Sequence, residues 1–233
     1  MPSYGAVDLE PLLRDLREES RPRLELVPEP GAMPALAMLA GSFDPITVGH
    51  EALAREAVAR VGSVALVYSA RTLPKDQPAN PALLSEEDRL NVLAAFCESR
   101  AGHVLGLASH GLLSEQVLAA SERFPNAELW LVMGSDKVLQ VLDPAWYRDR
   151  DGELGELFAK ARVLYAERAG HEGRVRRVLS RPDNRRWRDR FERMRLPGDV
   201  VAVSSRLVRE LVRRGEPVSH LVPAEARAAF RAG

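Results

Sequence analysis

The chain of 233 residues is 45% hydrophobic and 28% charged, which is typical of a globular protein with a sizeable core. Its 33 basic and 33 acidic residues balance, so the overall charge predicts no polyanionic partner. The single cysteine, Cys97, excludes an internal disulfide framework and a multi-cysteine zinc site, and we expect it to be a small buried residue on a helix.

No segment near the start of the chain has the features of a membrane or secretion signal. The longest apolar stretch there, residues 35–40, is far too short to span a bilayer. The N-terminus also lacks a basic segment that leads into an apolar one, so we expect no secretory signal. These observations predict a cytoplasmic protein without a membrane partner.

Residues 4–19 are predicted to form a short amphipathic helix, because apolar residues recur there at near-helical spacing, namely Val7, Leu9, Leu12, Leu13 and Leu16. Four prolines between residues 22 and 34 then break the chain into extended pieces and turns. We therefore expect residues 1–34 to form a helical and extended appendage to one main domain, residues 35–233.

From residue 35 onward, short apolar runs alternate with helical segments. The runs predict strands at residues 35–40, 63–69, 103–108, 128–133, 161–166 and 200–203. The segments between and after them predict helices at residues 51–61, 85–100, 114–124 and 205–214. Continuously apolar strands are expected when both faces of a sheet are covered. The pattern thus predicts an α/β fold with a doubly wound, mostly parallel sheet, which binds ligands beyond the carboxyl ends of its strands.

A ten-residue loop, Gly41-Ser-Phe-Asp-Pro-Ile-Thr-Val-Gly-His50, follows the strand at residues 35–40 and opens a helix. Glycine allows a backbone to approach a ligand closely, and a helix start attracts phosphate. His50 can add a hydrogen-bond donor or a positive charge, and Thr47 can add a hydroxyl. The loop lacks the lysine of a P-loop and the spacing of a dinucleotide fingerprint, and a purely structural turn would explain it about as well.

The loop resembles the signature of the nucleotidyltransferases that carry a (His/Thr)-x-Gly-His motif. That resemblance implies a Rossmann-like fold and places Thr47 and His50 at the triphosphate as catalytic residues. It also implies ATP contacts from the loop, at Gly41, Ser42, Phe43 and Gly49. Threonine at the first motif position is usual in the phosphopantetheine adenylyltransferases of this superfamily.

A second segment, residues 203–209, follows the strand predicted at residues 200–203 and starts a helix. Ser204 is a natural N-cap, Ser205 adds a hydroxyl, and Arg209 lies one turn further on. Simple capping plus a surface arginine would explain these residues if they stood alone. The segment resembles a Ser-Ser-Thr-x-Ile-Arg motif of the same superfamily, with Arg206 in place of the usual threonine. The resemblance implies that Ser204, Ser205 and Arg209 contact ATP and that Arg209 is also a catalytic residue.

A third segment contains Gly134 and Asp136 after the strand at residues 128–133, with Trp146 ten residues beyond. A carboxylate suits ribose hydroxyls and an indole can stack on a flat heterocycle, although core packing would also explain a tryptophan. The arrangement resembles nicotinate or nicotinamide mononucleotide adenylyltransferases. The resemblance implies that the aspartate contacts the nucleotide and that the tryptophan packs on the pyridine ring.

Lys75 and Arg89 are further candidates for acceptor binding. A solvated loop lysine, or an arginine that pairs with Ser85 or Glu86, would explain them equally well. No histidine–carboxylate metal motif is present, so Mg²⁺ is expected only as a partner of ATP.

Residues 174–195 hold ten arginines with few acidic residues. We favour a solvated helical surface, aided by Asp183, Asp189 and Glu192, over a phosphate-facing surface or a nucleic-acid patch. Nucleic acid is therefore not expected as a partner.

Together these features predict an enzyme that moves AMP from ATP to nicotinate (or nicotinamide) mononucleotide and releases pyrophosphate. Chain length, Gly134, Asp136 and Trp146 favour this acceptor, whereas Thr47 favours phosphopantetheine. Two alternatives remain. The chain is another small-acceptor nucleotidyltransferase, or it is a nucleotide-binding regulator that has lost turnover. The sequence leaves open whether the chain forms a homo-oligomer.

Overall fold

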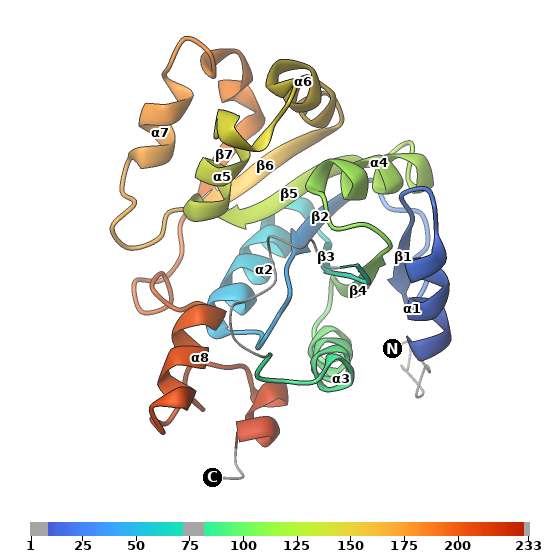
Figure 1. The fold of residues 1–233 in the computed structure, drawn as a ribbon, viewed down its shortest axis with the longest axis vertical. Coiled ribbons are helices and arrows are strands. Elements are labelled where there is room, and N and C mark those ends of the chain that lie inside the picture. Colours follow the sequence, from blue (N-terminus) through green and yellow to red (C-terminus); the bar gives the residue numbers. More distant parts are fainter. Residues whose placement is uncertain (1–8, 72–81, 231–233) are drawn as a thin grey trace.

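The computed structural model describes residues 9–71 and 82–230. One seven-stranded sheet is flanked by helices on both faces (Figure 1). Its strands are β1 Leu24–Val27, β2 Ala35–Ala40, β3 Val64–Ser69, β4 His103–Ala108, β5 Glu128–Gly134, β6 Ala161–Ala166 and β7 Phe191–Met194. The α-helices are α1 Leu9–Glu18, α2 Val48–Val61, α3 Glu86–Glu98, α4 Leu113–Arg123, α5 Ser135–Val141, α6 Arg150–Lys160, α7 Arg174–Leu179 and α8 Ser205–Arg213. Short 3-10 helices are η2 Pro144–Trp146, η3 Arg185–Arg190 and η4 Ala224–Phe230.

The strands lie in the order β1-β4-β3-β2-β5-β6-β7, and only β1 is antiparallel to its neighbour. From β4 to β7 this is the order of a Rossmann-like sheet, because the direction of winding reverses between β2 and β5. The predicted doubly wound α/β fold is therefore confirmed. Its switch point, between β2 and β5, is where a ligand site is expected.

Two hydrophobic cores, one on each face, hold the helices to the sheet. Successive side chains of a strand point to opposite faces, so Leu39 of β2 belongs to one core and Met38 to the other. The first core contains side chains of α1, α2, α3 and α8, and the second contains side chains of α4, α5, α6 and α7. Burial on both faces is the reason why the central strands are apolar throughout.

The strands predicted at residues 35–40, 103–108 and 161–166 have the same bounds in the structure. The strand predicted at residues 200–203 is wrong, because these residues form turns ahead of α8. Val203 is apolar because it is buried in that turn. The last strand is instead β7, an edge strand. Its exposed, charged residues Glu192 and Arg193 interrupt the apolar pattern by which a strand is recognised in a sequence.

The N-terminal residues pack into the same fold. Residues 9–18 form α1, within the helix predicted at residues 4–19, of which residues 4–8 lie outside the described part of the chain. Leu13 and Leu16 of α1 lie in the first core. Residues 24–27 form β1, which was not predicted and which pairs with β4. The division of the chain at residue 34 stays a prediction. No helix in residues 9–71 or 82–230 is long and apolar enough to cross a membrane.

Candidate active site

Thr47 and His50 form the first turn of α2 together. Thr47 is the N-cap, and its Oγ1 accepts a hydrogen bond from the main-chain N–H of His50. In return, Nδ1 of His50 accepts a hydrogen bond from the main-chain N–H of Thr47 at 3.1 Å. This is a capping box in which histidine takes the place of the usual glutamate. Because Nδ1 accepts, the neutral ring carries its proton on Nε2, which is left as a donor.

His50 is uncharged at neutral pH. Burial is the main cause that lowers its pKa to about 4, and the neighbouring Arg168 guanidinium lowers it further, while Asp136 opposes the shift. Of the two roles expected from the sequence, the structure thus favours the hydrogen-bond donor over the positive charge. Positive charge at this place comes from arginine.

The N-terminus of α8 meets the N-terminus of α2. A Cβ atom on Gly49 would lie only 2.6 Å from the main-chain oxygen of Val203, so this contact requires glycine. Ser205 donates a hydrogen bond from Oγ to the main-chain oxygen of Pro45 at 2.8 Å. The two segments predicted to converge do so, although they lie at opposite ends of the sequence.

Both helix starts present unused donors. The main-chain N–H groups of Gly49, Ser205 and Arg206 have no acceptor among the described residues. Ser204 is the N-cap of α8, and its Oγ accepts a hydrogen bond from Leu207 at 3.2 Å. Two positive dipole ends with free N–H groups at one point are a ready site for an anion such as phosphate.

Arg168, which the sequence did not single out, lies at the same point. Its Nε donates to a carboxylate oxygen of Asp136 at 2.8 Å, and its Nη1 donates to the main-chain oxygen of Val203 at 3.1 Å. A Cβ atom on Gly134 would lie 2.6 Å from a carboxylate oxygen of Asp136 and 2.8 Å from Nε of Arg168, so a larger residue where β5 ends would displace this ion pair. Arg168 follows β6 by two residues, and a search for polar residues just after each strand would have found it.

The residues of the first loop surround this point. Phe43 is buried, and its ring meets the ring of His50 edge-on, with 5.3 Å between the ring centroids. Arg89 donates a hydrogen bond to the main-chain oxygen of Ser42 at 3.3 Å and lies over the ring of Tyr68. Gly41 lies beneath the ring of Phe43, which a Cβ atom would approach to 3.3 Å. Lys75, the other acceptor candidate, falls outside the described residues.

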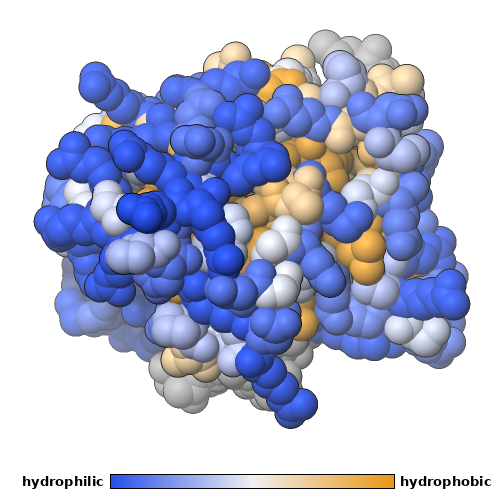
Figure 2. Space-filling view, turned by 90° about the horizontal axis from the view of Figure 1, so that it is seen from above, coloured by the Kyte–Doolittle hydropathy of each residue, from blue (hydrophilic) through white to orange (hydrophobic). Residues whose placement is uncertain are grey.

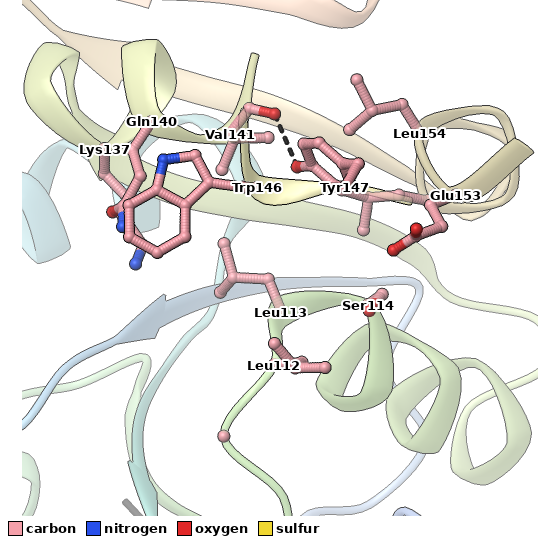
Figure 3. A pocket seen from close by; sticks show the side chains of 12 residues that line it. Leu112, Leu113, Ser114, Lys137, Gln140, Val141, Trp146, Tyr147, Glu153 and Leu154 are labelled. Carbon is pink, nitrogen blue, oxygen red and sulfur yellow. Dashed lines mark hydrogen bonds between the residues drawn. The ribbon is translucent and has the colours of Figure 1, made fainter. Parts of the chain in front are cut away.

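Trp146 lies on one side of a cavity of about 270 Å³, opposite Leu112 and Leu113 at the start of α4 (Figure 3). Lys137 and Gln140 of α5 also line this cavity, so it continues along the helix that carries Asp136. Core packing does not explain the tryptophan, because 42% of its surface is exposed. An apolar area is visible within a mostly hydrophilic face in Figure 2.

The described residues contain no group of three histidine, cysteine, aspartate or glutamate side chains that could hold a metal ion. The site therefore consists of helix N-termini, arginines, one neutral histidine and an aromatic cavity. This combination at the switch point of a doubly wound sheet defines a nucleotide-binding protein.

The Cytidylyltransferase-like family model matches residues 38–211, and the chain belongs to this family. The nucleotidyltransferase class inferred from the loop at residues 41–50 is thereby confirmed.

Among similar proteins is a probable nicotinate-nucleotide adenylyltransferase of Carboxydothermus hydrogenoformans, 26% identical over 197 residues, which cover 82% of this chain and 92% of the relative. Another, of Rubrobacter xylanophilus, is 28% identical over 202 residues, which cover 82% of this chain and 87% of the relative. The fold is similar to that of the Plasmodium falciparum nicotinic acid mononucleotide adenylyltransferase complexed with NaAD. That match has a TM-score of 0.61 and 12% identity, and covers 84% of this chain and 94% of the other.

Proposed function

We propose that the protein transfers the AMP portion of ATP to nicotinate or nicotinamide mononucleotide and releases pyrophosphate. The observation that carries the proposal is the meeting of two helix N-termini beside His50, with the Trp146 cavity further along α5. The names of the relatives in Carboxydothermus and Rubrobacter support the same acceptor.

The triphosphate of ATP binds at the two helix starts. Nε2–H of His50 and the free main-chain N–H groups of Gly49, Ser205 and Arg206 donate to its oxygens. Arg209 uses Nη1 on the main-chain oxygen of Asp44 and keeps further donors for phosphate. The remaining ATP contacts come from the loop, from the end of β5 and from the start of α8, at Gly41, Ser42, Phe43, Thr47, Gly134, Asp136 and Ser204.

The acceptor binds beside the ATP site. Its pyridine ring stacks on the exposed indole of Trp146, whose cavity is closed on the other side by leucine side chains. Its phosphate lies toward Arg89, which borders the first loop. Lys75 stays a candidate for the same phosphate on the sequence alone.

The reaction needs little proton transfer. An oxygen of the acceptor phosphate, already ionised at neutral pH, attacks the α-phosphorus of ATP, and the bond to the β-phosphate oxygen breaks. The chain aligns the two reactants and stabilises the charge on departing pyrophosphate, where each well-placed donor contributes about 3 kcal/mol. With a pKa of about 4, His50 serves as a donor rather than as a proton carrier. Mg²⁺ enters as part of the MgATP substrate, bound to phosphate oxygens.

A pyrophosphate-release assay tests the proposal, with ATP and each of nicotinate mononucleotide, its amide and 4′-phosphopantetheine. We expect kcat/KM with a pyridine mononucleotide to exceed that with phosphopantetheine by roughly 100-fold or more. A preference for phosphopantetheine, as Thr47 suggests, would refute the acceptor. Binding of ATP with no pyrophosphate from any acceptor would show a nucleotide-binding regulator instead.

A further inference from the structure

The arginine-rich segment, residues 174–195, covers one edge of the molecule from α7 through η3 to β7. It contains ten arginines, no lysine and three acidic residues. Since the whole chain is formally neutral, the rest of it has an excess of acidic residues, and positive charge is concentrated on this edge. We call this edge the arginine surface.

The arginine surface is held in place by a buried framework. Val175, Leu179, Trp187 and Met194 are buried beneath it. Asn184 is also buried, and its Nδ2 donates to the main-chain oxygen of Val178 at 3.0 Å. All ten arginines of the segment are exposed. The guanidinium groups therefore project from a structured backbone and not from a tail.

Most of this charge has no partner within the protein. Arg186 pairs with Asp151, and Arg193 pairs with Glu167 at 2.8 Å. The other eight arginines have no side-chain hydrogen bond or ion pair with any residue that the structure describes; they are Arg174, Arg176, Arg177, Arg181, Arg185, Arg188, Arg190 and Arg195.

The acidic residues of the segment do not neutralise it. Asp183 and Asp189 make no ion pair with a described residue. Glu192 pairs with Arg60, which is outside the segment, with 3.7 Å between Oε1 of the glutamate and Nε of the arginine. The arginines lie on an exposed surface, as expected, but the acidic residues of the segment do not pair with them. The charge is available to an external ligand.

The chemistry of the surface selects the ligand. A guanidinium presents a planar fork of donors that matches phosphate, and eight of them suit a chain of repeated phosphates. A protein interface or membrane insertion requires large exposed hydrophobic side chains. Among the described residues these occur only at Leu112 and Trp146, and neither belongs to this segment.

We infer that the arginine surface binds the phosphodiester backbone of nucleic acid without regard to sequence. Base recognition on this surface is not expected, because its tryptophan, Trp187, is buried and cannot stack on a base. Binding of this kind depends on the release of counterions and weakens steeply with salt.

Fluorescence anisotropy with a labelled RNA of about 20 nucleotides tests the inference. We expect a dissociation constant on the order of 10⁻⁵ M at physiological salt, equal for unrelated sequences. Arg177→Glu, Arg181→Glu and Arg188→Glu, combined in one variant, should weaken binding at least about 10-fold. They should also make the plot of log K against log salt shallower by about 2, because each single-strand phosphate contact contributes about 0.7.

A matched variant carries the same charge change elsewhere, at Arg14, Arg55 and Arg227, which are exposed and have no side-chain partner among the described residues. It should bind RNA within about 2-fold of the parent protein, and both variants should keep pyrophosphate release and the thermal midpoint. Absence of saturable binding at about 50 mM salt, or equal weakening by the two variants, would overturn the inference. So would competition by polyglutamate or inorganic polyphosphate as effective as that by unlabelled RNA.

Discussion

Arg209 donates a hydrogen bond from Nη1 to the main-chain oxygen of Asp44 at 2.6 Å, and the same atom lies 3.8 Å from the Asp44 carboxylate. This pair connects α8 to the loop at residues 41–50. The buried carboxylate also accepts hydrogen bonds from the main-chain N–H groups of Leu83 and Leu84. Asp44 thus joins three segments that are distant in sequence.

Replacement of Asp44 by alanine should destabilise the protein by about 1–3 kcal/mol, because the buried N–H group of Leu84 and the partly buried N–H group of Leu83 lose their acceptor. Urea unfolding measures the change. Asp44→Asn keeps one acceptor oxygen at the same place and should lose less. Equal stability of Asp44→Ala and the parent protein would contradict this account of the joint.

Replacement of His50 by alanine should lower kcat for pyrophosphate release by roughly 100-fold or more, since the Nε2–H donor to the triphosphate is lost. Circular dichroism should show an unchanged fold. His50→Gln, which retains a side-chain donor, should keep more of the activity. If His50→Ala transferred AMP at the parental rate, the histidine would have no part in the reaction.

The depressed pKa of His50 predicts how stability depends on pH. The histidine has a pKa of about 4 in the folded protein and near 6.5 when unfolded, so the unfolded chain binds more protons between these values. Stability should therefore fall as pH falls from 6.5 towards 4, with a loss of about 2 kcal/mol at pH 5 from this residue. Denaturant unfolding at pH 7 and pH 5 measures it. His50→Gln should lose correspondingly less, and an identical pH dependence would reject the assignment.

Replacement of Trp146 by alanine should raise KM for the pyridine mononucleotide about 10-fold, because ring stacking contributes about 1 kcal/mol or slightly more. KM for ATP should change little. Trp146→Phe preserves an aromatic face and serves as the control. An increase in KM for ATP alone would place the tryptophan at the adenine and not at the acceptor.

Gly49→Ala tests the contact between the two helix starts. The added Cβ would lie 2.6 Å from the main-chain oxygen of Val203, so α2 and α8 must separate and kcat/KM should fall by at least about 10-fold. Gly155→Ala is the matched control, because its Cβ would meet nothing within 4 Å. The control should keep full activity and gain about 0.5–1 kcal/mol in stability. Loss of activity in both variants would point to a general effect of alanine at glycine.

The sequence predicted the central strands well because they are buried on both faces. Ala35–Ala40 is an uninterrupted apolar run and Ala161–Ala166 is interrupted only by Arg162, and the bounds of both strands were predicted to the residue. β1 and β7 were not predicted because they are short strands at the two edges of the sheet. An edge strand has a neighbouring strand on one side only, so its residues need not all be apolar.

The residues of the candidate site likewise fall into two groups, those that the sequence predicted and those that it did not. His50, Thr47 and Ser205 belong to motifs that lie at helix starts, and helix starts are visible as patterns in a sequence. Arg168 belongs to no motif considered in the sequence, and its place depends on how β6 lies beside β5. The orientation of the His50 ring, which decides that it donates and carries no charge, depends on a capping box in which histidine replaces glutamate.

The hydrogen bond between Ser205 and Pro45 spans 160 residues of sequence. Almost the entire polypeptide must therefore be synthesised before the N-termini of α2 and α8 can meet. A chain truncated ahead of α8 would lack one of the two helix starts that form the phosphate site. Bound ATP would contact both α2 and α8 and hold them together. Its first effect in a proteolysis experiment should therefore be protection of α8 from cleavage.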